Sequence, residues 1–260
     1  MNLQLTGQRV LITGGSKGIG LAIAQAFAAE GAKPVLVSRD RANLANAVQA
    51  IEAACQIKPE IFEADLSQAG SAEKLHQQVG DIDVLVNNAG AIPGGTIHDI
   101  DEARWRQAWE LKVYSYINLT RAYLPLMEKR GRGVIVNIIG MAGVSPRYEY
   151  ICGAAANAAL IAFTQGLGGS SVRHGVRVFG INPSATRSDR MQGMLQQQAS
   201  SKLGDPSRWH ELTLGLPFGR LAEPDEMAKL SVFCASPLCS YLSGTVLNVD
   251  GGQMFTTPGK

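Results

Sequence analysis

Apolar and polar positions along this chain follow two alternating patterns: short apolar runs, and longer stretches with an apolar residue every three or four positions. The short runs predict β-strands, several of them apolar almost throughout, as strands covered on both faces are. These strands span Val10–Thr13, Pro34–Ser38, Ile61–Glu63, Val84–Asn87, Val134–Ile139, Val176–Ile181 and Val246–Val249. The longer stretches predict helices, which are clearest over Gly18–Glu30, Arg41–Ala54, Glu102–Lys129 and Asn157–Ser170.

Strands that alternate with helices predict one parallel sheet, because right-handed crossovers place the connecting helices on both of its faces. The predicted fold class is α/β, a doubly wound parallel sheet of about seven strands. A chain of 260 residues without low-complexity segments fits a single domain over residues 1–260.

Residues 187–218 break this rhythm, because methionine, leucine and tryptophan mix there with glutamine and serine. We expect this segment to be an apolar-lined insertion, and a mobile lid over a substrate pocket is one interpretation. The alternative is a surface helix pair that packs on the domain or on a neighbouring subunit.

Composition and charge exclude several kinds of partner. The 24 basic and 22 acidic residues give a formal net charge of +2 with no basic tract, so we expect no nucleic-acid partner. The start of the chain lacks a signal-peptide pattern, and about 18 consecutive apolar residues occur nowhere, so we expect a cytoplasmic protein without a membrane partner. The four cysteines and four histidines lack metal-ligand spacing, which predicts free thiols and no metal.

The segment Thr13–Gly20 follows the first strand and reads TGGSKGIG. Gly14 permits a tight turn, Gly18 lets the backbone approach a diphosphate, and Gly20 allows close packing of the next helix. The amino end of that helix offers free amide hydrogens to an anion. Together these features predict a dinucleotide-binding loop.

The second strand ends in Val37-Ser38-Arg39, which places a cation where an NAD-selective site carries an acid for the ribose hydroxyls. Lys17 adds a second positive charge. Arg39 and Lys17 together would bind a 2′-phosphate, so we predict NADP(H) rather than NAD(H) as the cofactor. In the alternative interpretation both are ordinary surface cations, and Asp40 binds the ribose.

Further blocks of sequence extend this pattern to the end of the chain. They are Asp65-Leu66, Asn87-Asn88-Ala89-Gly90, Asn182-Pro183, Pro217-Phe218-Gly219-Arg220, Ser243-Gly244 and Val249-Asp250-Gly251-Gly252. With the glycine loop, they make the sequence similar to the short-chain dehydrogenase/reductase family over essentially its full length. The resemblance implies a single-domain Rossmann fold with helices on both faces of the sheet. It also implies a homo-oligomer, commonly a tetramer, in which Glu102–Lys129 and Arg147–Ser170 pack against symmetry mates and the tail beyond Gly252 joins another interface.

The resemblance implies that the adenine, the ribose and the nicotinamide each meet one of these blocks. The block after Pro183 departs from the family pattern, with Ser184 in place of the usual glycine and Ser188 where threonine is common. The cofactor contacts expected from the loop and the resemblance are Gly14, Ser16, Lys17, Gly18, Ile19, Gly20, Arg39, Asp65, Leu66, Asn88, Ala89, Gly90, Asn157, Pro183, Ser184 and Thr186.

All four positions of the family's catalytic residues are substituted. Lys112 stands at the asparagine position and Asn157 at the lysine position, while glycine replaces the serine (Gly140) and the tyrosine (Gly153). Such a site is either rebuilt or abolished. Rebuilding is favoured because the lysine and asparagine are exchanged between two helices that face each other in the family fold.

Tyr150 provides the second reason, because it precedes Asn157 by seven residues, the tyrosine-to-lysine spacing of the family's enoyl-thioester reductase branch. We therefore hypothesise that Tyr150 donates the proton, Lys112 supplies the nearby charge, and Asn157 binds the nicotinamide ribose. Alternatively, Tyr150 and Tyr148 only pack against the pocket, and Lys112 extends to the surface without reaching the site.

The leading hypothesis is an NADP(H)-dependent oxidoreductase that acts on a carbonyl or alcohol group, or on an activated double bond, of a small to medium-sized apolar substrate. The apolar residues of 187–218 motivate the substrate preference. The alternative hypothesis is an NADP-binding protein with little or no turnover and a sensing or structural role.

Overall fold

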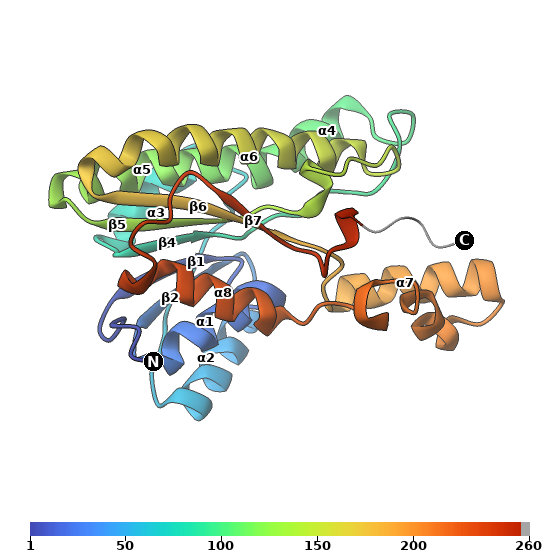
Figure 1. The fold of residues 1–260 in the computed structure, drawn as a ribbon, viewed down its shortest axis with the longest axis horizontal. Coiled ribbons are helices and arrows are strands. Elements are labelled where there is room, and N and C mark those ends of the chain that lie inside the picture. Colours follow the sequence, from blue (N-terminus) through green and yellow to red (C-terminus); the bar gives the residue numbers. More distant parts are fainter. Residues whose placement is uncertain (256–260) are drawn as a thin grey trace.

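The computed structural model describes residues 1–255 and builds one seven-stranded parallel sheet (Figure 1). The strand order is β3-β2-β1-β4-β5-β6-β7. The strands are β1 (Arg9–Thr13), β2 (Lys33–Ser38), β3 (Glu60–Glu63), β4 (Val84–Asn87), β5 (Gly133–Ile138), β6 (Val176–Pro183) and β7 (Val246–Val249). The predicted doubly wound α/β fold of seven strands is confirmed. Residues 256–260, the end of the tail expected to join an interface, lie outside the described residues.

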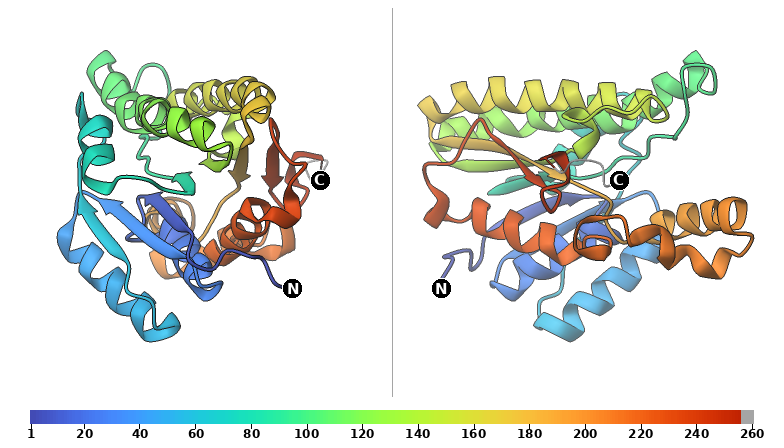
Figure 2. Two further views of the ribbon diagram at one scale, coloured as in Figure 1. Left: turned by 90° about the vertical axis from the view of Figure 1, so that its left-hand side faces the viewer. Right: turned by 45° about the vertical axis from the view of Figure 1, so that its right-hand side comes forward.

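Helices cover both faces of the sheet, as Figures 1 and 2 show. Helices α1, α2 and α8 share one buried cluster with the sheet, which includes Phe27, Ile51 and Val232. Helices α3 and α5 form the opposite layer around Leu75 and Tyr123, and α6 lies beside α5. The helices are α1 (Gly18–Ala29), α2 (Arg41–Cys55), α3 (Ser71–Val79), α4 (Glu102–Trp109), α5 (Ser115–Arg130), α6 (Ile151–Ser171), α7 (Asp189–Leu203) and α8 (Pro224–Ala235).

The predicted helix over Glu102–Lys129 is interrupted. A π-helical turn at Glu110–Tyr114 separates α4 from α5. Because a π turn holds an extra residue, it rotates the following side chains relative to a regular helix, and Lys112 and Val113 lie buried there. Spacing of apolar residues alone does not reveal such a turn. The predicted helix over Asn157–Ser170 also starts earlier, at Ile151, because Ala154 and Ala156 continue its buried face.

The segment over residues 187–218 contains α7 and two 3₁₀ stretches, Pro206–Thr213 and Pro217–Gly219. It projects from one end of the molecule (Figures 1 and 2). Trp209 is buried there with Ala199 and Leu221. Partly buried residues packed against this small cluster are Ala185, Met191, Leu195, Leu203, Leu212 and Leu216. The apolar residues of the segment therefore form a local core of their own.

One helical stretch among the described residues, Ile151–His174, has the length and mean hydropathy of a membrane span. It comprises α6 and the turn that follows it. This stretch lies along the sheet in Figure 1, and 44% of its most apolar window is buried inside the protein. We interpret it as a core helix of the domain.

Candidate active site

The loop between β1 and α1 forms a cradle that fits a diphosphate. Gly14 and Gly18 have φ of +64° and +54°, a conformation that residues with side chains rarely adopt. A Cβ at Gly20 would lie 2.2 Å from the Gly14 carbonyl oxygen, whereas a Cβ at Gly18 would meet no atom within 4 Å. Helix α1 begins at Gly18, and no side chain caps its amino end. The amide hydrogens of its first turn are therefore available to an anion.

The end of β4 is joined to the end of β1 at the point where the strand order reverses. The backbone N–H groups of Asn88 and Ala89 donate to Thr13 Oγ1 at 2.9 and 3.0 Å. Asn88 Nδ2 donates to the carbonyl oxygens of Thr13 and Gly14 at 2.9 and 3.3 Å. Ligands of doubly wound sheets bind in the crevice at such a reversal, so Asn88 supports the glycine loop at its ligand-facing end.

The two cations expected at the 2′-phosphate, Lys17 and Arg39, are exposed on neighbouring loops. Neither forms an ion pair with a residue between 1 and 255. Between these loops, Ser16 Oγ donates to Ser38 Oγ at 3.1 Å. Asp40, the alternative ribose ligand, accepts from the Asn43 N–H at 2.9 Å and caps α2. Its carboxylate therefore already has a structural role.

Asp65 and Leu66 follow β3 next to the same edge. Leu66 is buried and Asp65 half-buried. Burial alone would raise the pKa of Asp65, but hydrogen bonds from Ser67, with smaller contributions from Gln68 and the charge of Arg39, lower it below its usual value. The Ser67 hydroxyl and N–H donate to its carboxylate at 2.7 and 3.0 Å. Arg39 therefore lies close enough to Asp65 to act on its charge.

The loop after β6 carries the residues expected near the nicotinamide. Pro183 ends β6, and the Ser184 N–H donates to the Val249 carbonyl oxygen at 3.1 Å. Thr186 is buried, and its hydroxyl donates to the Ser184 carbonyl oxygen at 3.0 Å. The bond from Ser184 holds the loop against the carboxyl end of β7, and the bond from Thr186 closes a turn within the loop.

Lys112 extends into the interior. Its Nζ donates to the Ile138 carbonyl oxygen at 2.7 Å and to Tyr116 Oη at 3.0 Å. The Tyr116 hydroxyl also donates to the Ile138 carbonyl oxygen, at 2.8 Å. Burial without a carboxylate partner lowers the pKa of Lys112 to about 7 and raises that of Tyr116. Lys112 is thus a buried amine at the end of β5, not the surface-reaching cation of the alternative interpretation, and it would exchange a proton near neutral pH.

Asn157 lies beside the same end of β5. It is buried, and its side-chain amide forms no hydrogen bond with the part of the chain that the structure describes. Gly140 makes room for it, because a Cβ at Gly140 would lie 2.7 Å from Asn157 Nδ2. The Gly140 φ of +144° also disfavours a side chain. A serine at this position would therefore require the Asn157 side chain to move.

Tyr150 is related to Gly153 in the same way. A Cβ at Gly153 would lie 2.1 Å from Tyr150 Cε1 and 2.7 Å from its Oη. The ring of Tyr150 thus covers the position from which the family's tyrosine would project, and Tyr150 is half-buried against a cluster that includes Ile92 and Tyr116. Burial raises the pKa of Tyr150, whereas the charge of Arg190 opposes that rise.

The three predicted catalytic side chains come from two neighbouring elements, the π turn and α6, which contact each other. Lys112 bonds the carbonyl of Ile138, and Asn157 lies against Gly140 two residues further along. Sequence reasoning missed Tyr116 and Arg190. Tyr116 could have been found, because it follows Lys112 by four residues, about one helical turn. Nothing in the local sequence points to Arg190, because its contact with Ile92 spans 98 residues.

Asparagine pairs stiffen the carboxyl edge of the sheet below this site. Asn87 Nδ2 donates to Asn137 Oδ1 at 2.9 Å, and Asn182 Nδ2 donates to Asn248 Oδ1 at the same distance. Each pair stands opposite in register on adjacent strands. Asn182 Oδ1 also accepts from the Gly140 N–H at 3.2 Å, which fixes the backbone on which Asn157 rests.

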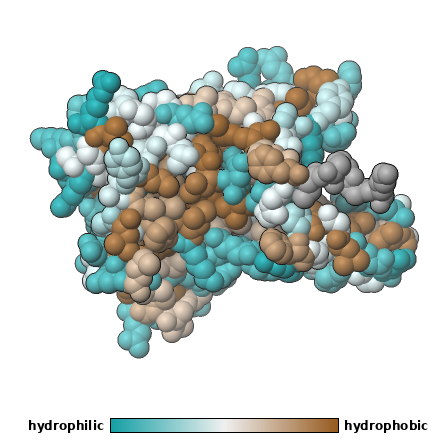
Figure 3. Space-filling view, in the orientation of Figure 1, coloured by the Kyte–Doolittle hydropathy of each residue, from teal (hydrophilic) through white to brown (hydrophobic). Residues whose placement is uncertain are grey.

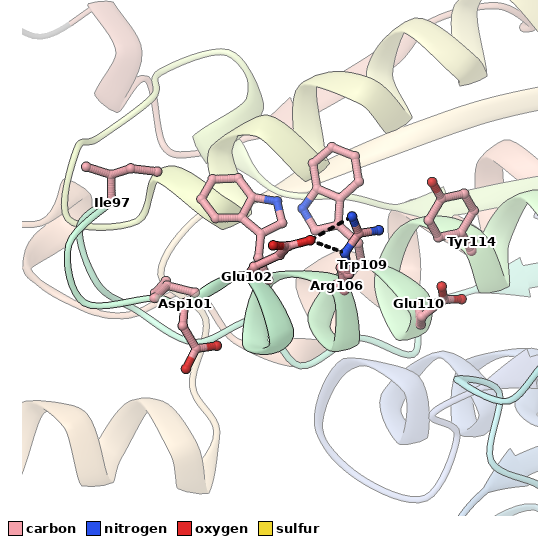
Figure 4. Close-up of a pocket in the computed structure, with 9 residues that line it drawn as sticks. Ile97, Asp101, Glu102, Arg106, Trp109, Glu110 and Tyr114 are labelled. Atoms are coloured by element: carbon pink, nitrogen blue, oxygen red, sulfur yellow. Dashed lines mark hydrogen bonds and ion pairs between the residues drawn. The ribbon is translucent and has the colours of Figure 1, made fainter.

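A separate groove of about 510 Å³ runs along α4 on the outer surface (Figure 4). Trp105, Trp109 and Tyr114 supply much of its apolar lining. Figure 4 shows Arg106 of α4 paired with Glu102, at 2.8 Å. The groove is lined by none of the predicted site residues.

Residues 8–199 match the family described as short chain dehydrogenase. The galactitol 2-dehydrogenase (L-tagatose-forming) of Cereibacter sphaeroides is 32% identical over 96% of both chains. Among solved structures, L-sorbose reductase from Gluconobacter frateurii, complexed with NADPH and L-sorbose, has a TM-score of 0.91 and 30% identity, with 99% of this chain and 100% of that chain covered. A 7α-hydroxysteroid dehydrogenase complexed with NADH has a TM-score of 0.83 and 29% identity over 96% of both chains.

These similarities extend over nearly the whole length of the chain, and the TM-scores show that the fold is shared. The chain therefore belongs to the short-chain dehydrogenase family, and it is an oxidoreductase.

Proposed function

We propose that the protein transfers a hydride between NADP(H) and the carbonyl or alcohol group of a small to medium-sized substrate. The arrangement of Tyr150 and Asn157 carries this proposal. Each side chain fills space that a side chain at Gly153 or Gly140, the family's tyrosine and serine positions, would need. If the active site had only been abolished, there would be no reason for these two glycines to stand beside side chains that fill the space. By their names, the relatives act on a polyol, a ketose or a hydroxysteroid, which supports alcohol and carbonyl chemistry.

The preference for NADP(H) rests on Lys17 and Arg39. Both cations are exposed beside the glycine loop, and the carboxylate of Asp40 is engaged by the first turn of α2. A guanidinium offers a bidentate fork to a phosphate, and an ammonium adds a point charge. The L-sorbose reductase complex with NADPH supports this choice, whereas the hydroxysteroid dehydrogenase complex contains NADH.

The cofactor, when bound, supplies or accepts the hydride. Asn157 has an unpaired amide with which to hold the nicotinamide ribose. In the reducing direction, Tyr150 Oη donates its proton to the substrate oxygen as negative charge develops there. Lys112 holds a proton at Nζ near neutral pH, between Tyr116 and the Ile138 carbonyl, and its charge stabilises the anionic state of the site.

We propose that residues 187–218, the lid segment, cover the substrate. The expected preference for an apolar substrate depends on fewer side chains than the composition of the segment suggests. Trp209 and its neighbours pack on one another and are not available to a substrate. The exposed apolar side chains of the segment are Met194, Leu214 and Phe218. A substrate with an apolar body beside its reacting group would contact such side chains.

The test is steady-state oxidation of NADPH, with NADH in parallel, across ketoses, 7-oxosteroids, simple ketones, aldehydes and enoyl thioesters. Tyr150→Phe and Lys112→Ala should each lower kcat/KM on the best substrate by on the order of 100-fold. Tyr148→Phe, on the exposed loop before α6, is the matched control and should retain activity. If neither variant lowers the rate, the site assignment is wrong. If the wild type binds NADPH but turns over nothing on the panel, the sensing or structural alternative replaces the proposal.

We also propose a cytoplasmic homotetramer. The groove on α4 is one apolar face that a second copy would cover. A second face lies over α8 and β7, where Figure 3 shows apolar residues gathered. Exposed apolar side chains of α8 and of the connection from α8 to β7 are Phe233, Leu238 and Tyr241. Two distinct faces fit a tetramer of 222 symmetry, because each forms a separate two-fold interface.

A further inference from the structure

Arg190 connects the lid segment to the predicted catalytic tyrosine. It is the second residue of α7, and its Nη2 donates to the carbonyl oxygen of Ile92 at 2.5 Å. Ile92 lies beyond β4 and belongs to the buried cluster against which Tyr150 packs. The hydrogen bond therefore fixes the Arg190 guanidinium, across 98 residues of sequence, to the segment whose Gly95 forms a β-bridge with Tyr150.

The charge of Arg190 is not neutralised by an acid. No carboxylate between residues 1 and 255 lies within 4.0 Å of it, whereas three other arginines between residues 187 and 220 are paired. Arg187 pairs with Glu223, and Arg208 and Arg220 pair with glutamates at 2.6 and 2.9 Å. Because no carboxylate offsets its charge, a guanidinium that a backbone carbonyl holds in place acts on neighbouring groups with its whole positive charge.

No other cation among the described residues shifts the pKa of Tyr150. The residue at the family's lysine position, Asn157, is neutral, and the Lys112 amine is bound by Tyr116 and a carbonyl oxygen. Among the described residues, the titratable groups that act on the Tyr150 phenol are Arg190 from α7 and Cys152 from its own helix. Burial raises the pKa of Tyr150 most, Arg190 lowers it, and Cys152 raises it slightly.

We propose that Arg190 is a positioning residue that supplies the positive charge beside Tyr150, in place of the lysine that the family carries at the position of Asn157. This inference rests on the proposed function of Tyr150. In the reducing direction the phenol O–H bond breaks, the proton forms the O–H bond of the product alcohol, and the phenolate left behind is stabilised by the guanidinium until water reprotonates it. Because Arg190 belongs to α7, the charge is present only when the lid segment is in place.

The test measures the tyrosine itself, independently of turnover. Phenolate absorbance near 295 nm is titrated in the wild type and in Tyr150→Phe, and the difference reports Tyr150. Arg190→Gln should raise the pKa of Tyr150 by about one pH unit or more, the effect of losing an adjacent opposite charge. Arg190→Lys should restore most of the difference. Arg187→Gln, whose guanidinium is paired with Glu223, is the matched control and should leave the titration unchanged.

Activity gives a second readout. The pH profile of kcat for the best substrate should move in Arg190→Gln in the direction of the titration and by a similar amount, and Arg190→Lys should move it back. A Tyr150 titration that is the same in Arg190→Gln, Arg190→Lys and the wild type overturns the inference, whatever the activity. A shifted titration together with full activity of Tyr150→Phe keeps the inference on Arg190 and rejects the proposed function of Tyr150.

Discussion

At the residue scale, Gly153 decides where the predicted proton donor lies. Tyr150 occupies the volume next to Gly153, where an added Cβ would overlap its ring at 2.1 Å. Gly153→Ala should therefore displace the phenol and lower kcat/KM by on the order of 100-fold, as misplacement by about 1 Å does in other enzymes. Gly166→Ala in the same helix is the control, since its Cβ would meet no atom within 4 Å. Equal activity of the two variants would show that the position of Tyr150 does not matter.

Lys112 should make stability depend on pH. Burial lowers its pKa from 10.5 to about 7 in the folded protein. Between these values the unfolded chain binds one more proton, so the free energy of unfolding rises with pH, by up to about 1.4 kcal/mol per unit. Below pH 7 both states are protonated, and the destabilising contribution is constant. Urea unfolding at several pH values should show this rise in the wild type relative to Lys112→Met.

The exposed lysine at position 129 of α5 provides the control for that comparison. Lys129→Met should follow the pH dependence of the wild type. If the difference in unfolding free energy between Lys112→Met and the wild type is constant from pH 6.5 to 10, the pKa of Lys112 is not lowered by burial, and the prediction is wrong.

Cofactor choice is also a residue-scale property. Arg39→Gln should weaken NADPH binding by about tenfold or more, because a charge-assisted contact to a phosphate contributes about 1.5–3 kcal/mol, and should leave NADH binding nearly unchanged. Lys17→Gln should act in the same direction. Fluorescence titration of both cofactors measures the effect. Equal losses for NADH and NADPH would mean that these cations act on the shared diphosphate and do not select the 2′-phosphate.

At the element scale, the lid segment is held together by its own small core. Trp209→Ala would leave Met191, Leu195 and Leu212 without the residue on which they pack. We expect the KM for substrate to rise several-fold and proteolysis within 187–218 to accelerate, while the Kd for NADPH changes by less than about twofold. Gln198→Ala, at an exposed polar position of the same segment, should do neither. A lost NADPH affinity in Trp209→Ala would instead tie this segment to the cofactor.

At the scale of the whole molecule, two separate apolar faces predict two kinds of dimer contact. Trp105→Glu in the α4 groove and Tyr241→Asp on the face over α8 and β7 should each reduce the tetramer to dimers, and the double variant should be monomeric. Sedimentation velocity at several concentrations measures the species. Met194→Asp, on α7 outside both faces, should remain tetrameric. A wild type that sediments as a monomer would contradict the assembly proposed here.

The architecture was predictable because its signals are local. Apolar runs such as Val84–Asn87 report burial on both faces, and the alternation of runs with helical spacing restricts the topology to a parallel doubly wound sheet. The phosphate cradle was predictable for the same reason. Gly14 and Gly18 reveal a required backbone conformation by their residue type alone.

The arrangement of the proposed catalytic residues depends on contacts that no local sequence pattern reveals. The sequence by itself determined the sheet, the family and the backbone conformation of the glycine loop, and it revealed that the four usual catalytic positions are substituted. Only the tertiary structure decided that Tyr150 lies over Gly153, that Lys112 points inward through a π turn, and that Arg190 reaches Ile92 from α7. The physical reason is range: a backbone conformation is set by neighbouring residues, whereas the volume around a side chain and the charge beside it come from elements far away in the chain.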